Sequence, residues 1–128
     1  MNAEGQRGGG QLRSAIAVAA IDEVRSDRDR IMDLHFSPEE VVEVKGRHPR
    51  TTAGFLAVKE ALCALYRDVV PAGRCEATDF TLSHDEQGRP VLVGAPGPIG
   101  APRSTWISIA HTRELAYGLA VFHERGRG

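Results

Sequence analysis

The sequence predicts an α+β fold in which an antiparallel sheet packs against one long helix. A short apolar run, Ala15–Ile21, is followed by helical patterns and then by three or four strand-like segments in succession. Strands that follow the helices, rather than alternating with them, favour an antiparallel sheet. The 128 residues are 41% hydrophobic, which suffices for one core but not for two ordinary domains. We therefore expect one domain over residues 15–123, between a disordered tail at 1–14 and a short tail at 124–128.

The first half of the chain carries signals for a strand and short helices. The run Ala15–Ile21 fits a helix because of its alanines, or a buried strand because of its length and its Ile and Val residues. The stretch Asp22–Leu34 has mixed charges and is expected to form a surface turn or helix. Ser37, followed by Pro38 and two glutamates, has the composition of a helix start, and Gly46 is suited to end that helix.

The longest helix is predicted over roughly Thr51–Tyr66. Apolar side chains recur within it at the spacing of one buried face, namely Phe55, Val58, Leu62, Leu65 and Tyr66. After it, alternating patterns and turn residues predict a hairpin and two further strands, in the order Phe80–Leu82, Pro90–Val93, Trp106–Ala110 and Leu115–Phe122.

Composition excludes several classes of protein. The net charge of −1 gives no basis for a nucleic-acid partner, and no apolar run approaches the length of a membrane span. The two cysteines, Cys63 and Cys75, are unlike a disulfide framework, and Cys63 on the apolar helix is expected to be a reduced buried thiol. Arg7 and Arg13 ahead of the first apolar run resemble a signal peptide only faintly, because that run leads directly into acidic residues. We therefore expect a cytoplasmic protein.

The adjacent pair Lys59 and Glu60 interrupts an otherwise uncharged stretch of the long helix. Residues three and four positions from Glu60 on that helix are small or apolar. A carboxylate in such surroundings is costly to desolvate unless a cation, a metal or strong hydrogen bonds compensate it. We therefore expect Glu60 to point at a functional site, with Asp22 and His111 as further candidates for that site.

Four segments carry a resemblance to a known family. They are Ala20-Ile21-Asp22, Phe55–Ala61, Gly88-Arg89-Pro90, and Ile107–Thr112 followed by Ala116 and Ala120. Their order and spacing are similar to those of the small phosphopantetheinyl transferases of the holo-acyl-carrier-protein synthase type. That family has Gly-x-Asp on its first strand, Phe-Ala-Ala-Lys-Glu-Ala on a helix, Gly-Lys-Pro in a hairpin and Ser-x-Ser-His-Thr before its last strand. The similarity spans Ala15 to Phe122.

The resemblance implies a reaction and a set of site residues. The family moves the 4′-phosphopantetheine arm of coenzyme A onto a serine of an acyl carrier protein, with Mg²⁺, and its members are commonly homotrimers with active sites between subunits. By resemblance Asp22 and Glu60 are metal ligands, and Lys59 matches the helix lysine of the family, which suits phosphate charge and makes it a second catalytic residue. The chemistry of the residues also allows Glu60 to accept the serine proton, directly or through a bound water. The coenzyme A site is expected at Arg47, Arg89, Pro90, Ser108, His111 and Thr112. This chemistry suits the residues, because Mg²⁺ on a diphosphate is typically held by one or two carboxylates, phosphate oxygens and water.

Several positions depart from the family pattern. Ala20 replaces a glycine, Ala110 replaces a serine, and the arginine before the helix phenylalanine has no counterpart at Gly54. A glycine-rich turn is replaced by Tyr66–Val70, and Ala64 stands where a lysine is usual. One lost electrostatic donor costs a transferase roughly 2.7–4 kcal/mol of transition-state stabilisation, so Ala64 and the missing turn put efficient activity in doubt.

Three hypotheses follow from the sequence. The leading one is an active but divergent transferase. The alternative is a catalytically impaired relative that binds coenzyme A or a carrier protein without efficient transfer. The third is an unrelated α+β binding domain. Structural roles also stay open, with Asp22 as a strand terminator or cap and His111 as a hydrogen-bonded structural histidine.

Overall fold

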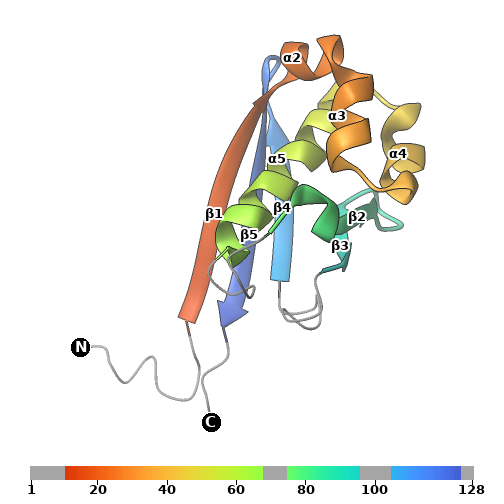
Figure 1. Cartoon of the computed structure of the whole chain (residues 1–128). Helices are drawn as coiled ribbons and strands as arrows, with labels where there is room; N and C mark the ends of the chain where they lie inside the picture. The colour runs from red at the N-terminus through yellow and green to blue at the C-terminus, as the bar shows by residue number, and fades with distance from the viewer. Residues whose placement is uncertain (1–10, 68–74, 96–104, 125–128) are drawn as a thin grey trace.

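The computed structural model describes residues 11–67, 75–95 and 105–124 (Figure 1). Two antiparallel sheets lie beside a group of helices. In chain order the elements are β1 (Gln11–Ala20), α2 (Ile21–Ser26), α3 (Arg28–His35), α4 (Pro38–Lys45), α5 (Pro49–Tyr66), the 3₁₀ helix η2 (Ala77–Asp79), β2 (Thr81–His84), β3 (Pro90–Gly94), β4 (Thr105–His111) and β5 (Leu115–Glu124). The predicted α+β class is confirmed.

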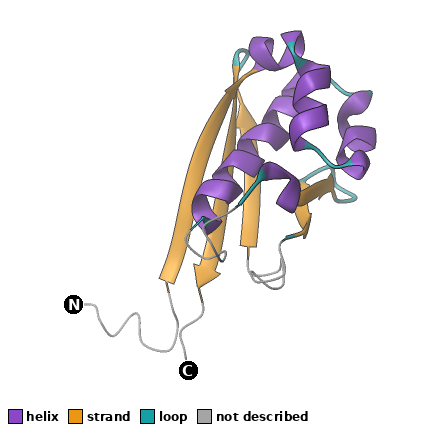
Figure 2. Cartoon of the chain, viewed as in Figure 1, coloured by secondary structure: helices purple, strands orange, loops and turns teal. Residues whose placement is uncertain are grey.

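The main sheet has three strands in the order β1-β5-β4, all antiparallel neighbours. Figure 2 shows the helices on one side of this sheet, with α5 lying along the strands. The contact between α5 and β5 is close at Gly118, where a Cβ atom would lie 2.3 Å from the backbone nitrogen of Val58. A glycine at this position therefore lets the helix and the strand approach each other.

The first strand is longer than the sequence predicted. Its ten residues begin at Gln11, four residues inside the expected tail, and they pair with β5 from Gln11↔Glu124 to Ala20↔Leu115. The ambiguity over Ala15–Ile21 is resolved in favour of a strand, which ends where α2 begins. Residues 1–10 of the predicted tail lie outside the described residues.

Local signals account for the helix boundaries. Ser37 caps α4 in a capping box with Glu40, and Gly46 is the residue at its C-terminal end, as predicted. Helix α5 begins two residues earlier than expected, at Pro49, because His48 caps it by accepting a hydrogen bond from the backbone N–H of Arg50. Its apolar face forms the centre of the core, with Phe55, Val58, Leu62 and Tyr66 fully buried.

The predicted hairpin is confirmed as a separate two-stranded sheet, β2-β3. Its turn contains Gly88 at φ +82°, a conformation that glycine adopts without strain.

The face of the main sheet turned away from α5 is apolar and exposed. Leu12 and Ile16 of β1 are 70% and 69% exposed, and Trp106 of β4 is 56% exposed. The registers Ile16↔Leu119 and Ser108↔Leu119 place these residues on one continuous surface, which we call the outer sheet face. Among the described residues, no helix is long and apolar enough to span a membrane.

Candidate functional site

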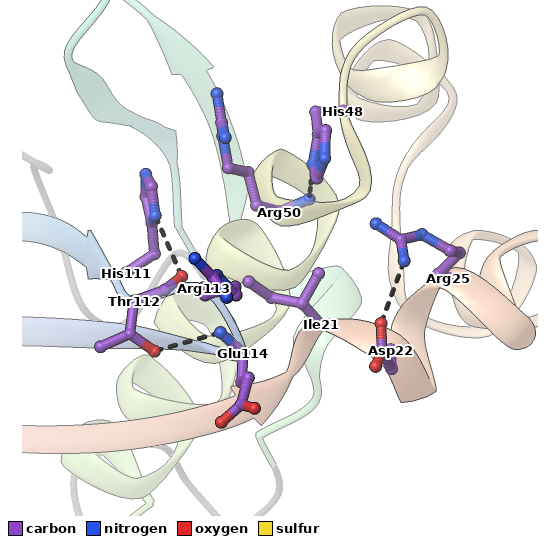
Figure 3. A pocket seen from close by; sticks show the side chains of 9 residues that line it. All are labelled: Ile21, Asp22, Arg25, His48, Arg50, His111, Thr112, Arg113 and Glu114. Atoms are coloured by element: carbon purple, nitrogen blue, oxygen red, sulfur yellow. Dashed lines mark hydrogen bonds and ion pairs between the residues drawn. The ribbon is translucent and has the colours of Figure 1, made fainter.

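A cavity of about 630 Å³ opens where β1 ends, beside the start of α5 and the turn between β4 and β5 (Figure 3). Five of its lining residues are basic or can become so: Arg25, His48, Arg50, His111 and Arg113. Two are acidic, Asp22 and Glu114. We call it the main cavity.

Backbone hydrogen bonds hold the walls of the main cavity together. The N–H of Ile21, at the junction of β1 and α2, donates to the carbonyl of Glu114 at 2.9 Å. The Thr112 hydroxyl accepts from the N–H groups of Glu114 and Leu115 at 3.2 and 3.0 Å, which fixes the turn. Asp22 is therefore held next to the turn that follows His111.

The electrostatics of the main cavity favour an anion. Asp22 pairs with Arg25 at 3.0 Å, whereas the guanidinium groups of Arg50 and Arg113 have no hydrogen bond or ion pair with any described residue. Desolvation, followed by the charges of Arg50 and Arg25, lowers the pKa of His48 from its ordinary value. Arg50 lies in the first turn of α5 and Arg113 in the turn between β4 and β5, and unpaired guanidinium groups of this kind are suited to phosphate.

A second hollow of about 200 Å³ adjoins the main cavity. It lies between the start of α5, the β2-β3 hairpin and β4, and includes His84, Gly88 and Pro90. Arg50 and His111 line both spaces. We call it the small hollow.

The structure brings together only part of the predicted site. Asp22, His111 and Thr112 line the main cavity, and Pro90 lines the small hollow. The other predicted coenzyme A contacts line neither space. Ser108 lies on the outer sheet face, because it pairs with Leu119 in register with the exposed Ile16.

Two arginines predicted to contact coenzyme A form ion pairs with carboxylates of the protein. Arg47 pairs with Glu43 at 3.5 Å, and Arg89 pairs with Asp85 at 3.0 Å.

Glu60 also lies outside both spaces. Its side chain is exposed and makes no hydrogen bond or ion pair with a described residue, so it remains available to a ligand. Burial against its surroundings raises the pKa of Glu60, and the charge of His35 opposes that shift. No group of three or more His, Cys, Asp or Glu residues with metal-binding proximity occurs in the described part of the chain.

Lys59 requires a correction, because its ammonium group does not reach either space. The residue is fully buried and donates to Glu40 at 2.6 Å, to the carbonyl of Phe80 at 2.7 Å and to the carbonyl of Ala77 at 2.9 Å. All three ammonium donors are thereby used. Burial lowers the pKa of Lys59, and the hydrogen bond with Glu40 opposes that shift.

The partner of Lys59 was not anticipated from the sequence. Glu40 is fully buried, and its carboxylate also accepts from the N–H groups of Ser37 and Leu82 at 2.9 and 2.7 Å. The ion pair thus joins α4, α5, η2 and β2. The available signal was the position of Lys59, four residues after Phe55 and three before Leu62, on the predicted buried face.

Comparisons with known proteins show the fold. The structure resembles a holo-(acyl-carrier-protein) synthase from Bacillus anthracis in complex with CoA (3′,5′-ADP), with 22% identity, a TM-score of 0.68, and coverage of 91% of this chain and 96% of that one. It resembles the Helicobacter pylori holo-[acyl-carrier-protein] synthase in complex with coenzyme A at 22% identity, with a TM-score of 0.68 and coverage of 88% and 100%. The ACPS–CoA complex of Chronobacterium ammoniagenes gives 19% identity, a TM-score of 0.72, and coverage of 91% and 99%. No protein-family model matches the sequence, and no curated protein does. The chain therefore has the holo-acyl-carrier-protein synthase fold.

Proposed function

We propose that this protein transfers the 4′-phosphopantetheine arm of coenzyme A to a serine of an apo acyl carrier protein, with Mg²⁺. The observation that carries the proposal is the main cavity, where Asp22, His111 and unpaired arginines meet within a fold whose neighbours include coenzyme A complexes. Coenzyme A carries phosphate groups that such a cavity suits.

The described residues fit Mg²⁺ that arrives with its phosphates rather than a preformed metal cage. Asp22 presents one carboxylate to the main cavity, and Mg²⁺ is commonly held by one or two carboxylates together with phosphate oxygens and water. When bound, the metal ion would neutralise negative charge on the diphosphate. Arg25, which pairs with Asp22 at 3.0 Å, would release that carboxylate to the ion.

The remaining residues of the chain have binding and proton-transfer roles in the proposal. Arg50, His111 and Arg113 bind and orient phosphate oxygens. Glu60 is retained as the second carboxylate and as the acceptor of the serine proton, since its raised pKa suits a proton acceptor and its side chain is exposed. Lys59 has no such role, because its donors are used within the core.

The release of 3′,5′-ADP tests the proposal. Incubation with Mg²⁺, coenzyme A and an apo carrier protein is expected to release 3′,5′-ADP only when the carrier serine is present. Asp22→Asn is expected to abolish release without unfolding the protein, because the side chain is exposed and leaves no cavity. Unchanged release by Asp22→Asn would refute the role of Asp22.

A catalytically impaired relative is the second candidate. The observations that favour it are the position of Glu60 outside the main cavity and the absence of a cation at the exposed residue Ala64. This candidate predicts binding of coenzyme A with no release of 3′,5′-ADP on any carrier.

We further propose a homotrimer, in which the outer sheet face lies against neighbouring subunits. Its exposed apolar residues would lose contact with water on assembly. This burial would stabilise the assembly by about 25 cal/mol per Å² of apolar surface removed from water. Ile16→Glu is expected to reduce the mass measured by light scattering to that of a monomer. Val42→Glu is the control, because Val42 is 81% exposed on α4, away from this face. A wild-type monomer at micromolar concentration would contradict the assembly.

A further inference from the structure

The two cysteines of the chain meet in the structure, although they belong to different segments. Cys63 lies in the last turn of α5, and Cys75 lies just before the 3₁₀ helix η2. A hydrogen bond joins their thiols, and both side chains are partly buried against the hydrophobic core. Both are free thiols in this structure. They form a dithiol pair that has no role in the proposed transfer reaction.

Neighbouring contacts hold the segment of Cys75 against α5 (Figure 1). The ammonium group of Lys59 donates to the carbonyls of Ala77 and Phe80 at 2.9 and 2.7 Å. Lys59 is fully buried and lies four residues before Cys63, so the two side chains share one face of the helix. Along this face Lys59 meets Ala77 and Cys63 meets Cys75. The contact between the thiols therefore belongs to a packed junction of α5 with η2.

The two thiols are not equivalent. Cys63 is the donor in their hydrogen bond, and Cys75 is the acceptor. Burial, followed by the proximity of Cys75, raises the pKa of Cys63 to about 12. Burial also raises the pKa of Cys75, but the hydrogen bond from Cys63 and the charge of Arg67 oppose that rise. Cys75 is therefore the thiol that ionises first, and a thiolate is the nucleophile in thiol–disulfide exchange.

We propose that Cys63 and Cys75 form a reversible redox site, which a low-molecular-weight disulfide converts into an intramolecular disulfide. The Cys75 thiolate attacks one sulfur of the reagent, forms a mixed disulfide and displaces one thiolate. Cys63 then gives its proton to solvent, attacks the Cys75 sulfur and displaces the second thiolate. Two protein thiols are thereby oxidised, and the disulfide bond of the reagent is reduced to two thiols. This site goes beyond the proposed function and does not depend on it.

The geometry of the pair favours the second step. The thiols are already in contact, so the attack by Cys63 is intramolecular and compensates for the small fraction of its thiolate. For the same reason the bond needs no large movement of the backbone. It would close a loop of about a dozen residues, and a cross-link of this size stabilises a protein when the native geometry accepts it.

The test is incubation of the reduced full-length protein with oxidised glutathione under native conditions, followed by unfolding in urea and alkylation. Intact mass then counts the remaining thiols. The wild type is expected to lose the mass of two hydrogen atoms, to retain no glutathione, and to regain two alkylatable thiols after treatment with dithiothreitol. The midpoint of its urea unfolding is expected to rise by about 1–2 M on oxidation.

Two single variants separate the roles of the thiols. Cys63→Ser removes the thiol that completes the reaction, so this variant is expected to retain one glutathione on Cys75. Cys75→Ser is the matched control, and it is expected to react at least about tenfold more slowly, because only the buried Cys63 thiol is left to attack. Neither variant can form the cross-link, so neither is expected to gain stability on oxidation.

Several outcomes would overturn the inference. The wild type could stay reduced, retain two glutathiones, form disulfide-linked dimers, or form the internal disulfide only after unfolding. A lowered urea midpoint of the oxidised protein would show that the bond requires a distorted fold. Equal reaction rates of the two single variants would refute Cys75 as the attacking thiol. None of these measurements involves coenzyme A or a carrier protein, so failure of the transfer reaction would leave the result unchanged.

Discussion

Replacing Lys59 by methionine distinguishes a structural lysine from a catalytic one. The change keeps the length of the side chain but removes the cation that Glu40 meets at 2.6 Å and the donors to the carbonyls of Ala77 and Phe80. Breaking one side of a buried ion pair costs about 3–5 kcal/mol, because it leaves an uncompensated charge. Each of the two carbonyls that loses its donor adds about 1 kcal/mol to this loss of stability.

The expected loss is therefore about 5–7 kcal/mol in the free energy of unfolding, a large share of the total of about 5–15 kcal/mol that is typical of a domain. Urea unfolding followed by circular dichroism measures it. The chain offers a matched control in Lys45→Met, since Lys45 is exposed in the last turn of α4 and should cost no more than about 0.5 kcal/mol.

A second substitution at Glu40 separates charge from packing. Lys59→Met combined with Glu40→Gln is expected to be more stable than Lys59→Met alone, because the neutral amide oxygen still accepts from the N–H of Leu82 without a buried charge. If Lys59→Met is instead as stable as the wild type and has lost binding of coenzyme A, the structural role is wrong and the catalytic role first predicted is restored.

Three further predictions address the core, a thiol and the main cavity. Gly118→Ala is expected to destabilise the protein by about 3 kcal/mol or more in urea unfolding, because the added Cβ would lie 2.3 Å from the backbone of α5. Gly46→Ala is the control, since its Cβ would meet nothing within 4 Å. An equal loss of stability in the two variants would refute the close approach at Gly118. Burial raises the pKa of Cys63 to about 12, so its thiolate is about one part in ten thousand at pH 8, and alkylation by iodoacetamide is expected to be about a thousandfold slower in native than in urea-unfolded protein. Similar rates would contradict that burial. Arg50→Gln is expected to raise the pKa of His48, measured by NMR titration of its ring, because it removes one of the cations that favour the neutral ring. An unchanged or lower pKa would show that Arg50 does not act on this part of the main cavity.

The fold was predictable wherever the residues of one segment contain the signal for the secondary structure of that segment. Ser37 and Gly46 bound α4 because capping is local. The apolar spacing from Phe55 to Tyr66 identified α5 for the same reason, and the turn at Gly88 identified the hairpin. The length of β1 was missed, since its extension to Gln11 depends on pairing with β5 about a hundred residues away.

The site was predictable only in part. The resemblance identified Asp22 and His111, and the pairing Ala20↔Leu115 explains why they meet, since it joins the end of β1 to the turn that follows β4. Arg50 was missed because no pattern surrounds it. An arginine in the first turn of a helix is electrostatically unfavourable for that helix, and this was the available signal for an anion site.

The surroundings of the charged pair on α5 differ from those expected from the sequence. Sequence reasoning surrounded Glu60 with apolar neighbours, whereas the helix turns Lys59 into the core and Glu60 toward solvent. The compensating charge for Lys59 comes from Glu40, 19 positions away on another helix, and no local pattern connects them.

The central claim is that this chain joins the phosphopantetheine arm to a carrier protein. The most direct measurement is the intact mass of an apo acyl carrier protein after incubation with the protein, Mg²⁺ and coenzyme A. We expect the carrier to gain the mass of one 4′-phosphopantetheine arm on its serine, and to gain nothing when Asp22→Asn replaces the wild type or the carrier serine is changed to alanine. The claim would be contradicted if the wild-type protein binds coenzyme A but every acyl carrier protein from the same cell stays in the apo form.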